Sequence, residues 1–418
     1  MKRFVGVKIL LSSLAILSTL TLHSTAVYAY DPDLKWTDIS PYRPFGSVHD
    51  FGILALGDLT VGNVTSADQT GNVRGGYFHS EGGVAVAGNV LLPLYHTTLD
   101  FGEAHKGVGN QIPDYDYRLL ISGNFYSTYA YDNVMSHRPP ASTPLELVAI
   151  MHGGTIGISE KSDFRSRGPI ETSQGTYGGV GSQKDENGYV TSWPNISRLS
   201  DEIINTFFAT GDNNLRWLSN YFANVTTDNG GQGVHIGNVI PGASWEYTKL
   251  EMPTEATELA AIDTIIFNLA NIPNGGDIPA LNFDFPAEFE GNVVVNIPIG
   301  GTARIAHANQ ITTANTGYYE LARAYSGRII YNFIGAGEIQ MTYHAVTGSI
   351  LALDADFLAP HGGSIDGEMM VRNLTHLGGG FEQHTTSFHQ LGGISMRPWW
   401  PIEEPEVEPE MPDVTPPM

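Results

Sequence analysis

The chain reads EGGVAVAGNV from Glu81 to Val90. Very small residues alternate here with valines, a pattern typical of a strand that has a close neighbour on one face. A second region reads GSILA from Gly348 to Ala352, then GGSIDG from Gly362 to Gly367, and then MVRNL from Met370 to Leu374. Short strands turned by Gly and filled with Ala, Val and Ile favour stacked coils with little room between their backbones. Both regions therefore favour a structural scaffold over a catalytic site.

Composition supports a folded, mostly β protein. The chain has 418 residues, of which 41% are apolar and 10% aromatic, and this excludes global disorder. Glycine occurs 48 times, and Thr, Asn, Tyr and Val are common, which favours turns and strands over long helices. Cysteine is absent, so catalytic thiols, disulfides and Cys-rich zinc sites are excluded.

The first 29 residues have the pattern of a secretory signal peptide. Lys2, Arg3 and Lys8 precede or begin an apolar run that ends near Leu22, and small residues lead to an expected cleavage site after Ala29. A membrane anchor is the alternative reading of this run, and we expect no membrane span after cleavage. The remaining chain has 18 basic and 44 acidic residues, which argues against a nucleic-acid partner. A ligand is expected to be neutral, cationic or bridged by a metal.

The chain divides into zones. Residues 30–50 are an irregular, Pro-containing lead-in, residues 51–393 form the β domain, and residues 394–418 are an acidic Pro- and Glu-rich tail, disordered or a spacer. Residues 196–224 have helical periodicity, which we expect Thr210-Gly211-Asp212 to interrupt. Asn195 or Ser197 is the expected N-cap. The preferred reading is an amphipathic helix or helical hairpin packed on the β body, and the alternative is a partner-binding helix.

Three later runs read as buried strands that carry an Asn near one end: residues 264–269, 291–297 and 328–333. Asn268, Asn296 and Asn332 indicate a stacked corner, where we expect them to hydrogen-bond the backbone of the next coil. No exact repeat length is evident. The predicted fold is mostly β: an irregular right-handed β-helix or solenoid-like body, with an accessory α-helical segment packed alongside.

Several ordered blocks support a family resemblance. Residues 51–59 and 81–89 resemble the opening signature of the choice-of-anchor A family of bacterial surface proteins, and residues 329–333, 348–352, 365–367 and 380–384 resemble its final coils. The resemblance covers roughly residues 51–393 and implies an adhesive domain on a bacterial surface. This chain departs from the family by showing no recognisable anchor motif. The motif positions, expected to be structural, are Gly57, Asp58, Gly82, Gly83, Gly88, Asn89, Gly348, Ser349, Gly367, Glu382 and His384.

Signals for chemistry are weak, and we expect no catalytic residues, no resident metal and no cofactor. His376, His384 and His389 have no zinc-ligand spacing, and a structural clamp on the final coil is the preferred role of Glu382 with His384. Asp114 and Asp116 are compatible with calcium or sugar binding. Tyr115 and Tyr117 are the candidate ligand contacts. Lys249 has a strand-like setting in which an internal crosslink to Asn or Asp is an alternative.

The favoured function is a secreted adhesin or binding scaffold at the bacterial cell surface or cell wall. Its expected partner is a host or environmental matrix protein or glycan. A polysaccharide-active β-helix enzyme is the first alternative, and it requires carboxylates clustered on one face of the coils. An ice-binding-like protein is the second alternative, and it requires a flat ladder of Thr residues, which the sequence does not reveal.

Overall fold

Successive strands visit three sheets in turn, so that three strands make one coil. The computed structural model describes residues 51–62, 76–92, 98–101, 117–127, 149–151, 155–166, 170–172, 175–177, 183–184, 190–192, 196–226, 233–242, 247–286, 289, 291–307, 310–312, 326–342 and 344–384. All of them lie within the unit Pro32–Met418.

Sheet A and sheet B each contain eleven strands. Sheet A consists of β1 (Phe51–Ala55), β4 (Gly83–Val86), β7 (Tyr117–Ile121), β10 (Thr155–Ser159), β16 (Ile196–Leu199), β17 (Val234–Ile236), β20 (Thr264–Asn268), β23 (Asn292–Pro298), β26 (Ile329–Ile334), β29 (Ser349–Ala352) and β32 (Met369–Val371). Sheet B consists of β2 (Leu59–Val61), β5 (Val90–Leu91), β8 (Phe125–Ser127), β11 (Phe164–Ser166), β14 (Gln183–Lys184), β15 (Val190–Ser192), β21 (Gly276–Asp277), β24 (Thr302–Ile305), β27 (Gly337–Met341), β30 (Ala355–Ala359) and β33 (Leu374–His376).

The third side of the coils is divided between two shorter sheets. Sheet C consists of β3 (Gly76–Ser80), β6 (Thr98–Phe101), β9 (Ala149–Met151), β12 (Ile170–Thr172), β13 (Gly175–Tyr177), β28 (Ala345–Thr347), β31 (Gly363–Asp366) and β34 (Gly379–His384). Sheet D consists of β18 (Asn238–Ile240), β19 (Thr248–Glu251), β22 (Leu281–Asp284) and β25 (Gln310–Thr312). Neighbouring strands are parallel except in pairs at the ends of the sheets, such as β18 with β19.

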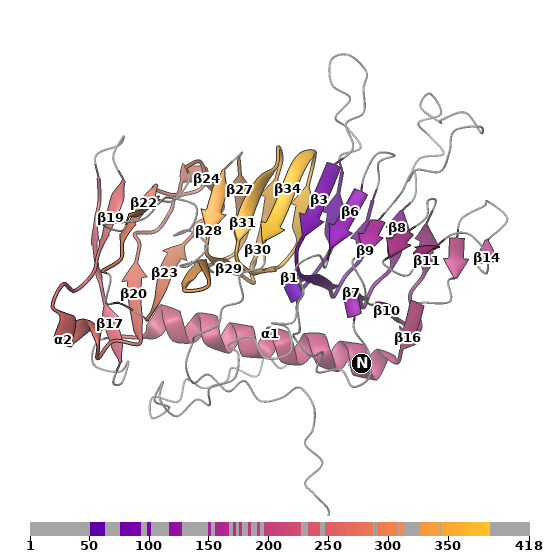
Figure 1. Cartoon of the computed structure of the whole chain (residues 1–418), viewed down its shortest axis with the longest axis horizontal. Coiled ribbons are helices and arrows are strands. Elements are labelled where there is room, and N and C mark those ends of the chain that lie inside the picture. The colour runs from indigo at the N-terminus through magenta and orange to yellow at the C-terminus, as the bar shows by residue number, and fades with distance from the viewer. Residues whose placement is uncertain are drawn as a thin grey trace, which may run out of the picture. The chain divides into compact units, whose positions relative to one another are not determined.

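The chain begins and ends its coils in the middle of the stack. Strand β1 pairs with β32, β2 with β33 and β3 with β34, so the first coil lies directly on the last one. The coils from β1 to β16 extend in one direction, and those from β17 to β32 return from the opposite end of sheet A. Helix α1 (Asp201–Asn224) connects the two ends and runs alongside the strands (Figure 1). Its 24 residues correspond to roughly 36 Å of helix.

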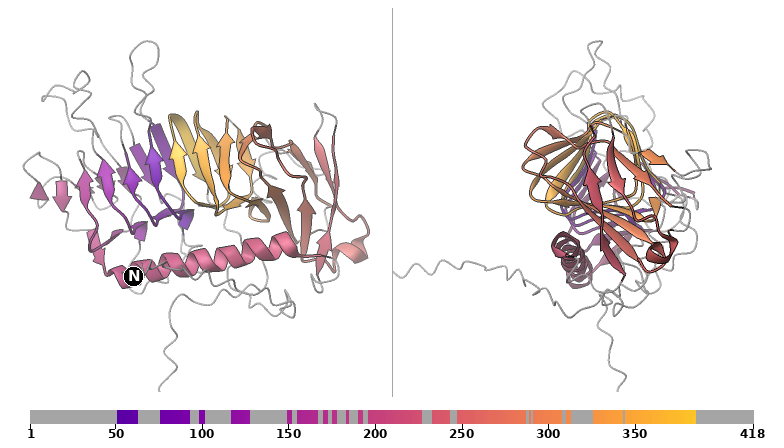
Figure 2. Two further views of the ribbon diagram at one scale, coloured as in Figure 1. Left: turned by 180° about the vertical axis from the view of Figure 1, so that it is seen from behind. Right: turned by 90° about the vertical axis from the view of Figure 1, so that its left-hand side faces the viewer.

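Both faces of sheet A are buried, for two different reasons. The inner face, with Ile53, Val84 and Val293, lines the core enclosed by the coils. The outer face, with Leu54 and Leu120, packs against α1, which lies outside the coils in the end-on view of Figure 2. This explains why β1, β4 and β29 are continuous runs of apolar or small residues.

Helix α1 confirms the predicted helical segment and corrects its details. Ser200 is the N-cap, because its side chain accepts a hydrogen bond from the backbone N–H of Ile203, and residues 196–199 are strand β16. The helix continues through Gly211, so the expected interruption at Thr210-Gly211-Asp212 is wrong. Gly211 is buried in the apolar stripe with Phe207 and Leu215, and this packing outweighs its low helix propensity. A short second helix, α2 (Ala256–Leu259), precedes β20.

The three Asn residues at the strand ends do form a stacked ladder. In register across β20, β23 and β26, Asn296 donates to Asn268 Oδ1 at 2.7 Å, and Asn332 donates to Asn296 Oδ1 at 2.8 Å. The Nδ2 groups of Asn296 and Asn332 also donate to backbone carbonyls of α1, those of Phe222 at 2.6 Å and Ser219 at 3.0 Å. The ladder therefore binds the side chains of neighbouring coils and the helix backbone, where the sequence had suggested the backbone of the next coil.

Candidate binding surface

Within the described part of the chain, no helix packs on the outer face of sheet B (Figure 1). Its strands alternate between inward and outward side chains, so that Leu59 and Val61 are buried while Thr60 between them is not. The strand registers join the outward positions of nine adjacent strands into one row. We name it the sheet-B row: Arg165, Tyr126, Leu91, Thr60, Thr375, Leu358, Gln340, Arg304 and Asp277.

The sheet-B row has an uncharged centre and charged ends. Leu91, Thr60, Thr375 and Leu358 occupy consecutive strands and are half-buried. Neighbouring strands lie roughly 4.8 Å apart, so these four side chains form a regular apolar and hydroxyl patch. At one end, Arg304 pairs with Asp277 at 2.7 Å. This arrangement suits contact with a flat, weakly charged surface.

The motif residues near the first two coils lie at the corner between sheets A and B. Asp58 Oδ1 accepts hydrogen bonds from the backbone N–H and the side-chain amide of Asn89, at 2.7 and 3.0 Å. The backbone N–H of Asp58 donates in turn to Asn373 Oδ1 of the last coil at 2.7 Å. Gly57 donates to the carbonyl of Arg372 at 2.6 Å. A Cβ at Gly88 would lie only 2.6 Å from the carbonyl carbon of Gly57, so this corner requires glycine.

The other motif glycines and Ser349 also lie where coils touch. Gly82 accepts a hydrogen bond from the Ser80 hydroxyl at 3.1 Å, and Gly83 begins β4 opposite Phe51. Gly348 has a φ of +125°, and its N–H donates to the carbonyl of Asp366 at 2.9 Å. Ser349 Oγ accepts a hydrogen bond from the backbone N–H of Glu368 at 3.0 Å. The backbone N–H of Gly367 donates to the carbonyl of His384 at 2.9 Å.

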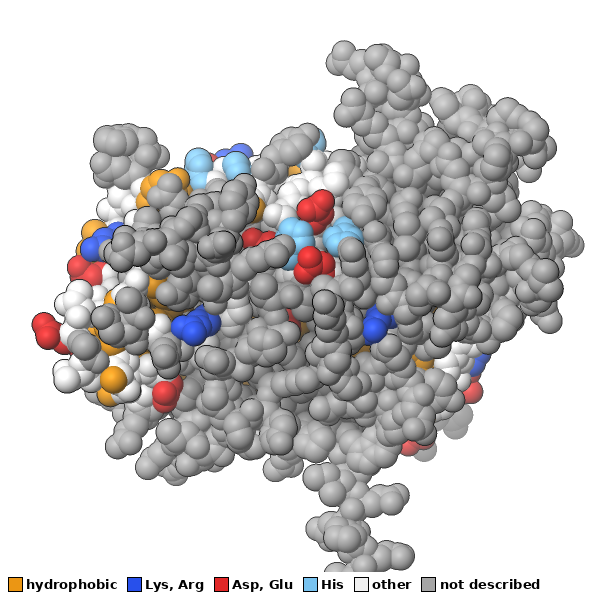
Figure 3. Space-filling model, in the orientation of Figure 1, with side chains coloured by type: hydrophobic (Ala, Val, Ile, Leu, Met, Phe, Trp, Pro, Cys, Tyr) orange, Lys and Arg blue, Asp and Glu red, His pale blue; other side chains and the backbone are white. Residues whose placement is uncertain are grey.

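Glu382 and His384 lie on the last strand of sheet C, next to Asp366. The His384 Nδ1 atom lies 2.6 Å from Asp366 Oδ1, and Nε2 lies 3.4 Å from Glu382 Oε2. The hydrogen bond to Asp366 raises the pKa of His384 above its ordinary value, against the opposing effect of burial. Histidine and acidic side chains gather near the middle of the face shown in Figure 3. The contact with Asp366 joins β31 to β34, whereas the contact between His384 and Glu382 lies within β34.

Tyr117 is not an exposed ligand contact, which corrects the expectation from sequence. Its side chain is 1% exposed and packs in the cluster between sheet A and α1. The alternation of polar and aromatic residues around it suggested a surface turn, but Tyr117 begins the buried strand β7. Tyr115, Asp114 and Asp116 lie outside the described residues, as do His389 and the residues after 384.

The described residues contain no group of three side chains suited to bind a metal ion. His376 is fully buried beside Phe78 and Phe381, with Nε2 2.9 Å from the carbonyl oxygen of Gly378. It therefore belongs to the core. Lys249 is on β19, as its strand-like setting predicted, and its side chain is exposed. Within the described part of the chain, no helix is long and apolar enough to cross a membrane.

The sheet-B row was missed at the sequence level, although a signal for it exists. Each residue of the row between Arg165 and Thr375 follows a corner Asp or Asn by two positions: Asp163, Asn124, Asn89, Asp58 and Asn373 precede Arg165, Tyr126, Leu91, Thr60 and Thr375. The separations between the corner residues are irregular, at 31, 35 and 39 residues. This irregular spacing hides the repeat.

Comparison with known proteins gives a matching family and, among others, two similar solved structures. The family described as "Putative Ice-binding-like adhesive domain" matches residues 44–385. One similar solved structure is an ice-binding protein (LeIBP) from Arctic yeast: identity is 13%, coverage is 84% of this chain and 96% of that chain, and the TM-score is 0.27. Another is an ice-binding protein from an Antarctic Flavobacteriaceae bacterium: identity is 10%, coverage is 81% and 98%, and the TM-score is 0.26. No curated protein sequence matches.

Proposed function

Because the chain belongs to the family of ice-binding-like adhesive domains, we propose that it is a non-catalytic adhesin displayed on a bacterial surface. Export is supported by the charged start, apolar run and small residues of positions 1–29. We assign the chain within this family to the choice-of-anchor A type, on the ordered blocks between residues 51 and 384, and we propose that its coils are right-handed. The partner is a matrix protein or glycan of a host or of the environment.

The sheet-B row carries this proposal. It extends over nine strands, and its centre presents Leu91, Thr60, Thr375 and Leu358 on one face. Parallel strands hold these side chains at a fixed spacing, so little conformational entropy is lost on binding. A surface of this kind gains affinity from many small contacts, as adhesion to a repetitive partner requires.

The test is attachment of the secreted chain to arrays of glycans and matrix proteins. A double substitution, Thr60→Arg with Thr375→Arg, places two bulky cations at the centre of the row and should abolish attachment. The control is Ala345→Arg, which adds the same side chain at an exposed position of sheet C. If the double variant attaches as well as the wild type, the row is not the adhesive surface. Release of reducing ends from the array polysaccharides by the wild type would instead favour a polysaccharide-active enzyme.

Ice binding is the second candidate function, and one observation favours it. Thr60 and Thr375 lie directly opposite one another on β2 and β33, at the centre of a regular row. The row contains only these two threonines, with leucines beside them, so it is not the flat ladder of Thr residues that the ice-binding alternative requires. Thermal hysteresis and inhibition of ice recrystallisation decide between the two functions. Activity in the wild type that disappears in the Thr60→Arg, Thr375→Arg variant would replace adhesion by ice binding.

A further inference from the structure

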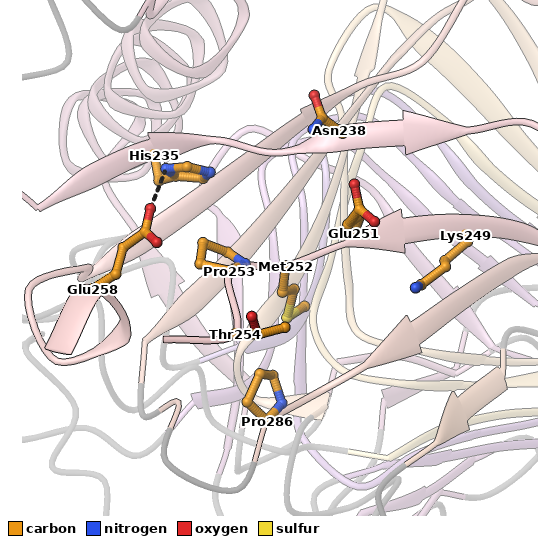
Figure 4. A pocket seen from close by; sticks show the side chains of 9 residues that line it. All are labelled: His235, Asn238, Lys249, Glu251, Met252, Pro253, Thr254, Glu258 and Pro286. Carbon is orange, nitrogen blue, oxygen red and sulfur yellow. Dashed lines mark ion pairs between the residues drawn. The ribbon is translucent and has the colours of Figure 1, made fainter. Parts of the chain in front are cut away.

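A pocket of about 540 Å³ lies at the end of the stack that begins with β17. It is lined by side chains from β17, β18, β19, the segment leading into α2, α2 itself and the residues after β22 (Figure 4). Its size falls in the range of small-molecule sites, roughly 300 to 1,000 Å³. None of its lining residues belongs to sheet B. They are His235, Asn238, Lys249, Glu251, Met252, Pro253, Thr254, Glu258 and Pro286.

Strand pairing places three of the polar groups together. In the antiparallel pair of β18 and β19, Asn238 lies opposite Glu251, so their Cβ atoms are roughly 5 Å apart. Lys249 lies two residues before Glu251 and shares its face of the strand. The side chains of Asn238, Lys249, Glu251 and Thr254 make no hydrogen bond or ion pair within the described part of the chain. The pocket thus presents one group that only donates hydrogen bonds, the Lys249 ammonium, and one that only accepts them, the Glu251 carboxylate. The Asn238 amide and the Thr254 hydroxyl beside them can both donate and accept.

The charges of the pocket select against a strongly charged ligand. Glu258 lies 4.0 Å from His235 on the far side of the pocket from Lys249 (Figure 4). Acidic and basic groups therefore both face the same space, and either sign of net charge on a ligand would meet a like charge. The whole chain carries a formal charge of −23, which further disfavours polyanions. A neutral ligand rich in hydroxyl groups meets neither obstacle, because each hydroxyl can donate to Glu251 or accept from Lys249.

Apolar surface completes the site. Pro253 and Pro286 line the pocket beside its polar groups. Ile240, opposite Lys249 in the strand pair, is 43% exposed, and Tyr247, which directly precedes β19, is 40% exposed. Among the described residues only one other large hydrophobic side chain, Ile203, has comparable exposure. Sugars combine apolar C–H faces with a rim of hydroxyls, so they match exposed apolar and aromatic side chains placed next to polar groups.

We propose that this pocket binds a short segment of a neutral polysaccharide, with Glu251, Lys249 and Asn238 bonding its hydroxyls. This site is additional to the sheet-B row and does not depend on the function assigned to that row.

The test is isothermal titration calorimetry of the secreted chain with three neutral trisaccharides: cellotriose, maltotriose and tri-N-acetylchitotriose. At least one should bind with a Kd on the order of 1 mM or tighter. Glu251→Gln and, separately, Lys249→Gln should each weaken this binding by about tenfold or more, because each removes a charge-assisted hydrogen bond. Glu255→Gln is the matched control, since Glu255 is exposed nearby and does not line the pocket.

Three outcomes overturn the proposal. The first is that no neutral trisaccharide binds the wild type at concentrations well above the millimolar range. The second is that binding is the same in the wild type and in both pocket variants, with unchanged melting temperatures showing that all are folded. The third is that trigalacturonic acid, the charged probe, binds more tightly than every neutral trisaccharide. This test does not use the array results for the sheet-B variants. The pocket proposal and the sheet-B proposal can therefore be refuted independently.

Discussion

Asn89 Oδ1 accepts two hydrogen bonds from Asn124 of the next coil, one from its backbone N–H and one from its side-chain amide, each at 3.0 Å. Asn89 makes the same pair of bonds to Asp58 on its other side. Asn124 Oδ1 accepts from the backbone N–H of Asp163 at 2.8 Å, so the pattern passes from coil to coil. These side chains satisfy backbone N–H groups that the bend between sheets A and B leaves without strand partners.

Asn89→Ala should therefore destabilise the fold strongly. The substitution removes the oxygen that accepts two hydrogen bonds from Asn124 and the side-chain amide that donates to Asp58, which leaves partly buried polar groups without partners. We expect a loss of about 2 to 4 kcal/mol in the free energy of unfolding, measured by urea denaturation. The control is Asn271→Ala, an exposed position outside the ladder, which should change stability by less than about 0.5 kcal/mol. Equal effects of the two substitutions would show that the ladder contributes no stability.

Ala85→Leu should overpack the interface between sheet A and α1. Ala85 is fully buried and lies between Leu54 and Leu120 in the strand registers. All three belong to the cluster that includes Phe207 and Leu215 of the helix. Extra methylene groups at this position must displace the helix or adopt strained rotamers, at a cost of about 1 to 3 kcal/mol. Thermal unfolding of the variant measures this cost.

The matched control for this prediction is Ala345→Leu. Ala345 is exposed on sheet C, so the same added volume meets no packed neighbour. An unchanged melting temperature for Ala85→Leu would mean that α1 does not pack closely on β4.

The strands could be predicted from sequence more completely than their arrangement. Runs such as residues 264–269 and 328–333 are buried strands because their apolar content matches sheets covered on both faces. The pairing of Ile53 with Met369 could not be predicted, because the chain must first extend in one direction, cross along α1 and return. Asp58 and Asn373, which lie 315 residues apart, are hydrogen-bonded for the same reason. The local sequence around either residue does not indicate such a long-range contact.

The binding surfaces were less accessible to sequence reasoning than the fold. Tyr117 looked like a surface aromatic because acidic residues precede it, yet the second layer formed by α1 buries it. Thr60 and Thr375 are ordinary residues of two distant three-residue strands, and only the strand register makes them neighbours. The pocket lined by Lys249 and Glu251 depends on an antiparallel pair at the end of an otherwise parallel stack. Strand register and the strand pairing at the end of the stack arise only when the coils assemble, so the local sequence does not predict them.

His384 should titrate above the ordinary range of histidine. The hydrogen bond from its ring to Asp366 favours the protonated form, so its pKa in the folded state exceeds the unfolded value of 6.5. The folded state then holds the proton more tightly than the unfolded state, and the resulting stabilisation is complete below about pH 6.5. It is lost as pH rises through the pKa of the folded state. NMR titration of the ring protons measures this pKa.

Asp366→Asn is the variant that isolates this interaction. It removes the charge that faces His384 Nδ1 and should return the pKa of His384 toward 6.5. Glu338→Gln, a charge neutralisation on sheet B, is the control and should leave the titration of His384 unchanged. A pKa of His384 that is the same in the wild type and in Asp366→Asn would show that the pair does not form in solution.

His376 should have the opposite effect on stability. Its ring is buried beside Phe78 and Phe381, and this burial lowers its pKa to about 4 from the model-peptide value of 6.5. Between these two values the unfolded state binds a proton that the folded state does not, so stability falls as pH decreases from about 6.5 to about 4. The loss reaches about 3 kcal/mol at pH 4 and levels off below it. His376→Phe should remove this pH dependence while keeping the apolar contacts, and urea denaturation at a series of pH values compares the two proteins. If the wild type and His376→Phe lose the same stability between pH 6.5 and 4, His376 is not the neutral core residue described here.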